Sequence, residues 1–359
     1  DETKTTPEGV VLHRVVATTT FTLASGKTIN AGDLGGWIEK ESNLSDNAWV
    51  SDNAQVYGNA KVSDDAMVSG NARVSGNARV TNNSQIDGDA LVTGNAMVFG
   101  HVEITGNAKV DGNARVAGKA RVSGDARVAG SAEIDGNAMV TDKAWVTGDA
   151  QVNGNAMVTD KALVLGDVSG NAQVSGRAMV TDGARVDDNA QVNGKTWVAG
   201  KVSGNAKVSG NAKVSDNAKV SDNAIVSDNA IIYGYAQVYG DAKVYGNAWV
   251  YDDAQVSGGA EVEGNAQVSG HTWIHGDAKV SGNARVSGKA DISDDIQIAG
   301  DTKIRNMRDY RAFKNNCSNV LSDGLDDLGN LMAFAEHNNR SNELSDALND
   351  LSSQDNIQL

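Results

Sequence analysis

Apolar and polar residues recur with a period of six along most of the chain. From Val202 to Val250 a valine or isoleucine occupies every sixth position, and the repeating unit reads x-V-S-[GD]-N-A. The x-V-S segment predicts a short strand whose central side chain points to one face while its neighbours point to the other. Glycine, aspartate and asparagine tolerate a sharp turn with positive φ, and alanine fits a crowded corner. Three such sides predict a triangular parallel β-helix with about eighteen residues per coil.

The period of six extends from Ile38 to Ile304 with two interruptions, at 164–168 and 198–202, where the spacing falls to four. Roughly 46 inward apolar positions correspond to about fifteen coils. With a strand spacing of ~4.8 Å these coils predict a rod about 70 Å long. Both short units fall on the same side of the prism, and we expect them to be tightened corners. Each is either a neutral indel or an irregular point where a site forms.

Segments without the repeat flank the coil, which predicts a cap over residues 1–36, a β-helix over 37–304 and a C-terminal segment over 305–359. Residues 10–34 are rich in β-branched residues and predict two or three strands that cover the open end of the coil. After Ile304 the apolar spacing changes to three and four, which predicts helices. The first helical face comprises Leu321, Leu325, Leu328, Leu331 and Met332, and the second comprises Leu344, Leu348 and Leu351 after an N-cap at Ser341.

Composition agrees with a solenoid lined by valine and alanine. The chain has 40 glycines, a single proline and 5% aromatic residues, whereas strands that all donate to a ladder have little place for proline. Cys317 is the only cysteine, so no internal disulfide can form, which favours a reducing compartment. The net charge of −15 argues against a nucleic-acid groove. The sequence shows neither a secretory signal nor an apolar run long enough to cross a membrane, so we expect a cytoplasmic protein, with a virion component as the alternative.

Residues 31–60 contain GDLGGWIEKESNLS followed directly by NAWV and NAQVYGNA. This segment resembles the hexapeptide-repeat proteins of phages and prophages, in which a GGW-[IV] and NLS signature begins the coil. The resemblance assigns Gly35, Gly36 and Trp37 to a cap motif and implies a left-handed parallel β-helix. It brings no known reaction and no catalytic residues.

His271 and His275 are the closest pair among the five histidines, and they are the candidates for a catalytic base or a metal clamp. Hexapeptide β-helices are the scaffold of many acyltransferases, which are usually trimers with a histidine base. The resemblance of this chain to those enzymes is one of scaffold alone. Here no third ligand and no projecting loop accompanies the pair. Corner aspartates serve the turns, because the nonapeptide calcium-binding period is absent. We therefore predict neither a metal nor a cofactor.

Outward positions carry the candidate binding surface. Stacking by eighteen places four tryptophans, Trp37 among them, on one side of the predicted prism, and one outward tyrosine follows on each of four successive strands from Tyr233. Exposed aromatic groups in a contiguous patch are typical of association, although aromatic residues also favour any β-surface. The predicted binding surface comprises Trp145, Trp197, Ile231, Tyr233, Trp249 and Tyr251.

Three functions agree with these observations. The first is a non-catalytic rod of phage or prophage type that binds a protein partner or itself, as a trimer if it oligomerises. The second is an acyltransferase-like enzyme. The third is an acidic decoy or sponge that acts against a host defence protein, which the net negative charge and the regular prism suggest.

Overall fold

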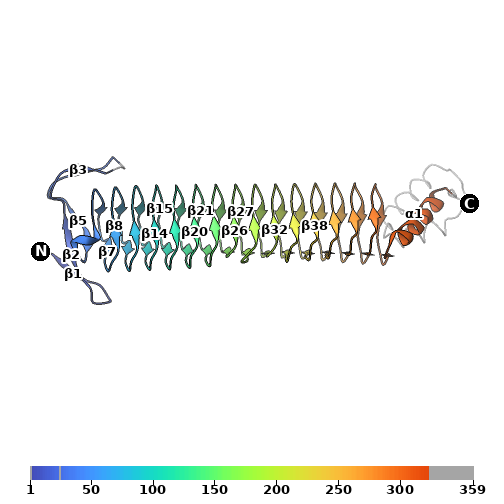
Figure 1. Cartoon of the computed structure of the whole chain (residues 1–359), viewed down its shortest axis with the longest axis horizontal. Helices are drawn as coiled ribbons and strands as arrows, with labels where there is room; N and C mark the ends of the chain where they lie inside the picture. The colour runs from blue at the N-terminus through green and yellow to red at the C-terminus, as the bar shows by residue number, and fades with distance from the viewer. Residues whose placement is uncertain (1, 24–25, 323–359) are drawn as a thin grey trace, which may run out of the picture. The chain divides into compact units, whose positions relative to one another are not determined.

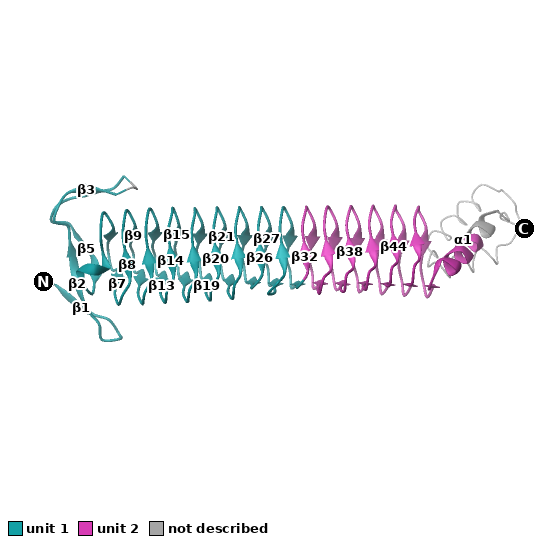
Figure 2. Cartoon of the chain, viewed as in Figure 1, with its two compact units in different colours: residues 1–199 teal, residues 200–359 magenta. Residues whose placement is uncertain are grey.

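The hexads fold into short parallel strands that form three sheets in each of two compact units. The computed structural model describes residues 2–23 and 26–322, and the chain divides into unit 1, residues 1–199, and unit 2, residues 200–359 (Figure 2). Each repeat strand contains the x and V residues of the hexad. The residue after the valine still donates to the next coil, as the Tyr57 N–H does to the Val74 carbonyl at 3.0 Å. The observed strands are therefore one residue shorter than the predicted x-V-S segment, although the third residue keeps its backbone hydrogen bond.

Unit 1 contains three parallel sheets, which we name A, B and C (Figure 1). The strands of sheet A are β5 (Leu34–Ile38), β7 (Gln55–Val56), β10 (Arg73–Val74), β13 (Leu91–Val92), β16 (Lys109–Val110), β19 (Arg127–Val128), β22 (Trp145–Val146), β25 (Leu163–Val164), β28 (Met179–Val180) and β31 (Trp197–Val198). The strands of sheet B are β8 (Lys61–Val62), β11 (Arg79–Val80), β14 (Met97–Val98), β17 (Arg115–Val116), β20 (Glu133–Ile134), β23 (Gln151–Val152), β26 (Asp167–Val168) and β29 (Arg185–Val186). The strands of sheet C are β6 (Trp49–Val50), β9 (Met67–Val68), β12 (Gln85–Ile86), β15 (Glu103–Ile104), β18 (Arg121–Val122), β21 (Met139–Val140), β24 (Met157–Val158), β27 (Gln173–Val174) and β30 (Gln191–Val192).

Unit 2 also contains three parallel sheets, which we name D, E and F. The strands of sheet D are β34 (Lys213–Val214), β37 (Ile231–Ile232), β40 (Trp249–Val250), β43 (Gln267–Val268), β46 (Arg285–Val286) and β49 (Lys303–Ile304). The strands of sheet E are β32 (Lys201–Val202), β35 (Lys219–Val220), β38 (Gln237–Val238), β41 (Gln255–Val256), β44 (Trp273–Ile274) and β47 (Asp291–Ile292). The strands of sheet F are β33 (Lys207–Val208), β36 (Ile225–Val226), β39 (Lys243–Val244), β42 (Glu261–Val262), β45 (Lys279–Val280) and β48 (Gln297–Ile298).

The inward valines form continuous columns inside each unit. Val74 pairs with Val92, Val92 pairs with Val110, and all three side chains are fully buried. In unit 2 the same register joins Ile232 to Val250. Sheet C has nine strands and each sheet of unit 2 has six, so the described residues form nine coils in unit 1 and six in unit 2. The predicted β-solenoid of about fifteen coils is therefore confirmed.

The two turn residues of the hexad, glycine or aspartate followed by asparagine, have different roles at the corners. The first residue of the turn has a positive φ, as at Gly76 (67°) and Asp52 (56°). Where this residue is aspartate, its carboxylate links successive coils, since Asp52 Oδ2 accepts the Gly70 N–H at 3.2 Å. The asparagine that follows forms a side-chain ladder, in which Asn77 Nδ2 donates to Asn95 Oδ1 at 2.9 Å. The first residue therefore shapes the turn, and the second ties the corners together.

The first four-residue spacing is a tightened corner of unit 1, as predicted. Val164 ends β25 in sheet A and Val168 ends β26 in sheet B, so the chain still changes sheet although two residues are missing. A Cβ atom on Gly166 would lie against the carbonyl oxygens of Thr181 and Ala184, so only glycine fits this corner. The second short spacing contains residues 199 and 200, at which the chain divides into its two units.

Antiparallel strands close the first coil of unit 1. Strand β1 (Thr3–Thr5) pairs with β2 (Val11–Val16), and β2 pairs with β5, whose other edge is joined in parallel by β7. A Cβ on Gly35 would lie 2.6 Å from the Val50 carbonyl oxygen, and one on Gly36 would lie 2.6 Å from Val50 Cγ1. The two glycines of the cap motif therefore let β5 approach the first coil closely.

A hairpin and a short 3-10 helix complete this end of unit 1. Strands β3 (Phe21–Thr22) and β4 (Thr28–Ile29) form the hairpin, which extends along the outside of the first coils (Figure 1). The Phe21 ring meets the Trp49 ring edge-on with centroids 5.9 Å apart. The helix η1 (Glu41–Asn43) precedes Leu44, which makes a parallel bridge to Val62. The prediction of an N-terminal cap made of strands is confirmed.

Helix α1 (Met307–Ser322) packs at the C-terminal end of unit 2. Asn306 caps its first turn, because the Asp309 N–H donates to Asn306 Oδ1 at 3.0 Å. Tyr310 is buried on the last coil. A C-terminal helix is therefore confirmed, and it begins before the first of the predicted leucine faces. The predicted face from Leu325 onward and the second face, Leu344 to Leu351, lie outside the described residues.

Candidate interaction surfaces

Two groups of outward side chains contain the six residues of the predicted binding surface. Trp145 and Trp197 belong to unit 1, whereas Ile231, Tyr233, Trp249 and Tyr251 belong to unit 2. Each group is described within its own unit.

The unit 2 residues form one contiguous aromatic cluster, which we define as Ile231, Tyr233, Trp249 and Tyr251. The Tyr233 and Tyr251 rings stack with centroids 5.0 Å apart and an interplanar angle of 1°. The Trp249 ring meets Tyr233 edge-on, with centroids 6.4 Å apart. The parallel register causes this contact, because Ile231 pairs with Trp249 and the tyrosines follow two residues later on the same face. Trp249 is 40% exposed, so the cluster presents an aromatic edge to solvent.

Carboxylates border the aromatic cluster. Asp216 and Asp252 lie at corners with positive φ, and each accepts a backbone N–H from the next coil. Burial raises the pKa of the Tyr233 hydroxyl above its ordinary value, and Tyr251 and these two aspartates raise it further. The phenol therefore stays neutral at physiological pH and offers a hydrogen-bond donor beside the rings.

The two remaining tyrosines of the predicted series, Tyr239 and Tyr245, follow strands of sheets E and F, so the four tyrosines do lie on successive strands of unit 2. Tyr245 donates to Glu261 at 3.3 Å, and Lys243 Nζ lies 2.9 Å from the same carboxylate. Lys243 holds the pKa of Glu261 below its ordinary value although burial opposes this shift. These side chains form a polar network on sheet F, separate from the aromatic cluster.

Unit 1 carries a row of outward apolar side chains on sheet A, which we name the apolar row: Trp145, Leu163, Met179 and Trp197. Successive members pair directly in the parallel register. Trp145 and Trp197 are each 45% exposed and Met179 is 39% exposed. The earlier coils carry Gln55, Arg73, Leu91, Lys109 and Arg127 at this position. The row therefore marks a change from a mainly polar to an apolar outer face.

Trp37 does not belong to an exposed surface, which corrects the prediction that it lies on the outer side with the other tryptophans. It occupies an outward position of sheet A, but only 6% of it is exposed, because the N-terminal cap covers it. The Arg14 guanidinium lies 4.9 Å from the centre of its ring and the Lys4 ammonium 5.6 Å from it. Trp37 is thus a structural residue of the cap, fixed by two cation–π contacts.

His271 and His275, the candidate catalytic pair, each contact a different carboxylate of unit 2. His271 Nδ1 lies 3.4 Å from Asp253, and two thirds of the His271 side chain is exposed. His275 Nε2 lies 2.8 Å from Asp291, and its ring packs 4.3 Å from that of Trp273. Among the described residues no group of three histidine, cysteine or acidic side chains could hold a metal ion. The structure thus places both histidines in surface contacts with carboxylates, and their role in catalysis stays a prediction.

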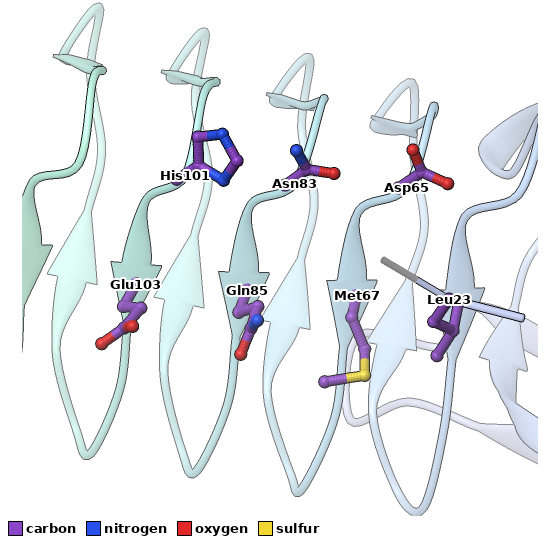
Figure 3. Close-up of a pocket in the computed structure, with 7 residues that line it drawn as sticks. All are labelled: Leu23, Asp65, Met67, Asn83, Gln85, His101 and Glu103. Atoms are coloured by element: carbon purple, nitrogen blue, oxygen red, sulfur yellow. The ribbon is translucent and has the colours of Figure 1, made fainter. Parts of the chain in front are cut away.

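A hollow beneath the β3–β4 hairpin was not predicted from the sequence. It measures about 240 Å³ and is lined by Leu23, Asp65, Met67, Asn83, Gln85, His101 and Glu103 (Figure 3). Asp65, Asn83 and His101 lie in one row at successive corners, whereas Met67, Gln85 and Glu103 lie on successive strands of sheet C (Figure 3). Glu103 also pairs with Arg121 at 3.1 Å. The period of six predicts both rows of side chains. The hairpin, which contributes Leu23 to the hollow, has no repeat from which its position could be predicted.

The stacked sheets, the six-residue period and the columns of buried valine define the class of this protein as a β-solenoid repeat protein. Within this class, a family model described as the YdcK β-solenoid repeat matches six segments of the chain: residues 54–70, 72–88, 120–132, 172–188, 218–234 and 236–252. Four of these segments lie in unit 1 and two in unit 2, so the likeness holds for both units. No curated protein matches the chain. None of the helices in the described residues has the length and apolarity of a membrane span.

Proposed function

We propose that this protein is a non-catalytic β-solenoid scaffold of phage or prophage type that binds a protein partner, or a second copy, through outward aromatic side chains. The observation that carries the proposal is the aromatic cluster. A stacked pair of tyrosines with a perpendicular, half-exposed tryptophan offers a rigid apolar surface with a phenol donor at its edge. Such side chains are enriched at the energetic centres of protein interfaces.

The test compares the wild-type chain with the double variant Trp249→Ala, Tyr251→Ala. Partners are captured from host lysate and quantified, and the mass of the purified protein in solution is measured in parallel. We expect the double variant to lose capture or self-association by roughly tenfold or more, because central aromatic residues dominate interface energies. Trp273→Ala is the matched control, since Trp273 is also exposed in unit 2 but lies on sheet E.

Equal capture and equal mass for wild type and double variant would overturn the role of the cluster. Turnover of acetyl-CoA by the wild-type protein that is lost on His275→Ala would overturn the non-catalytic assignment.

A further inference from the structure

Four consecutive coils of unit 1 carry a cation at the corner between sheets C and A. The residues are Lys143, Lys161, Arg177 and Lys195. The preceding five coils carry Asn53, Asn71, Asp89, Asn107 and Asp125 at the same corner position. The cationic coils are also the coils of the apolar row, because each cation lies two residues before a row member, as in KAWV, KALV, RAMV and KTWV.

The backbone holds the four cations in a line. The N–H of Lys143 donates to the Asp160 carbonyl at 2.7 Å, that of Lys161 to Gly176 at 2.8 Å, and that of Arg177 to Gly194 at 2.6 Å. Successive cations are therefore one strand spacing apart, about 4.8 Å along the coil axis at their Cα atoms. We call the four cations together with the apolar row the cationic strip.

Neighbouring carboxylates do not neutralise this line by direct pairing. Asp142 Oδ2 accepts the Asp160 N–H at 3.3 Å, and Asp160 Oδ2 accepts the Gly176 N–H at 2.9 Å, so both carboxylates are directed along the corner. Within residues 2–23 and 26–322, none of the four cations forms an ion pair. An open hollow of about 710 Å³ follows this corner. Its lining includes the cations Lys143, Lys161 and Arg177 and the carboxylates Asp125, Asp142 and Asp160. A ligand with negative charges can therefore contact the cations without displacing an existing partner.

The chain itself contains a segment with the complementary chemistry. Residues 323–359 hold eight acidic side chains and one basic side chain. The segment also contains leucines at 325, 328, 331, 344, 348 and 351. Acidic groups interspersed with leucine match a surface in which a line of cations runs beside a line of apolar groups. We propose that the cationic strip binds this C-terminal segment, residues 323–359, of a second copy of the chain.

The first test uses a zero-length carbodiimide reagent, which joins amines to carboxylates in contact, on the full chain. We expect links from Lys143, Lys161 and Lys195 to acidic residues of 323–359. Lys61 and Lys109 are the matched controls, since both are exposed in unit 1 outside the strip. In a mixture of ¹⁴N- and ¹⁵N-labelled protein we expect links that join the two isotopes, and links confined to one isotope would overturn the proposal. Links to the control lysines as frequent as links to the strip would overturn the proposal.

The second test measures binding of a labelled peptide of residues 323–359 to a full chain whose eight C-terminal acidic residues are changed to their amides. We expect Lys143→Glu, Lys161→Glu and Lys195→Glu together to weaken binding about tenfold or more, as loss of several complementary charges does at an interface. Lys61→Glu and Lys109→Glu together should leave binding unchanged. A scrambled peptide of the same composition should bind more weakly.

Equal binding of the native and scrambled peptides would overturn the assignment of this segment, because any acidic chain would then suffice. Circular dichroism of each variant confirms that the coil is intact. The proposal does not rest on the aromatic cluster, so Trp249→Ala, Tyr251→Ala should leave both tests unchanged.

Discussion

The cationic strip of unit 1 and the aromatic cluster of unit 2 share one outward hexad position but differ in the second position that they use and in chemistry. The cations lie two residues before the shared position, and the tyrosines lie two residues after it. The strip extends over four coils and alternates corner cations with apolar side chains. The cluster is confined to two coils, is built from stacked rings, and is bordered by carboxylates. Beneath both surfaces the inward residue of every strand is a buried valine or isoleucine. The comparison teaches that the inward positions maintain the fold, whereas the outward positions are free to diverge into surfaces of different specificity.

The largest effect should come from changes that reach the shared interior. Val146→Asp, beneath the strip, and Val250→Asp, beneath the cluster, each place a carboxylate in a fully buried column. We expect each to lower the free energy of unfolding by roughly 4 kcal/mol or more, because a buried charge without a partner is among the most destabilising changes known. Denaturant unfolding followed by circular dichroism measures the effect. Lys109→Asp, at an exposed outward position, is the control, and a similar loss there would contradict the distinction between inside and outside.

A smaller effect should distinguish the tightened corner beside the strip from an open corner of the preceding coil. Gly166→Ala places a methyl group against two backbone carbonyls, and we expect it to destabilise unit 1 by about 3 kcal/mol through overpacking. Gly148→Ala meets no atom within 4 Å, and only its φ of +70° opposes the side chain. We therefore expect Gly148→Ala to lower the free energy of unfolding by about 1 kcal/mol. Thermal unfolding of both variants makes the comparison, and a Gly148→Ala that is the more destabilising would show that the tightened corner relaxes freely.

The smallest effect should appear in the polar network of sheet F, which has no counterpart in the strip. Because Lys243 lowers the pKa of Glu261 in the folded chain, this carboxylate stabilises unit 2 above its unfolded pKa. The contribution is lost as the pH falls from about 4.5 through the lower folded value. We expect Glu261→Gln to remove less than about 1 kcal/mol at pH 7, since the pair is partly exposed, and nothing at low pH. Urea unfolding at pH 7 and pH 3 provides the measurement. A loss that persists unchanged at pH 3 would mean that packing, and not charge, is responsible.

Much of the fold could be predicted from the sequence because a period of six leaves one consistent arrangement. Counting every sixth residue from Ile38 predicted which side chains form the buried column. The four-residue spacing from Val164 to Val168 was enough to predict a tightened corner. The aromatic contacts between Tyr233, Tyr251 and Trp249 also follow from stacking by one coil.

The parts that could not be predicted depend on segments without a repeat. Trp37 has the same hexad position as the exposed Trp145, yet the cap covers it with Arg14 and Lys4. Trp49 is buried in the same way beneath Phe21. No spacing in the sequence tells which outward residues such segments will reach, and the hollow beneath the β3–β4 hairpin was missed for the same reason. The cationic corner could have been found by comparing corner residues coil by coil, since the change from asparagine or aspartate to lysine or arginine is visible in the sequence.

The antiparallel pairing of β2 with β5 also gives the molecule a direction of assembly. One edge of β5 is occupied by β2, and the other is open to β7. Because translation proceeds from the amino terminus, these strands leave the ribosome before any full coil of the repeat does. Once these strands have paired, β5 therefore offers a free edge on which the first coil can form, and each coil then offers an edge to the next.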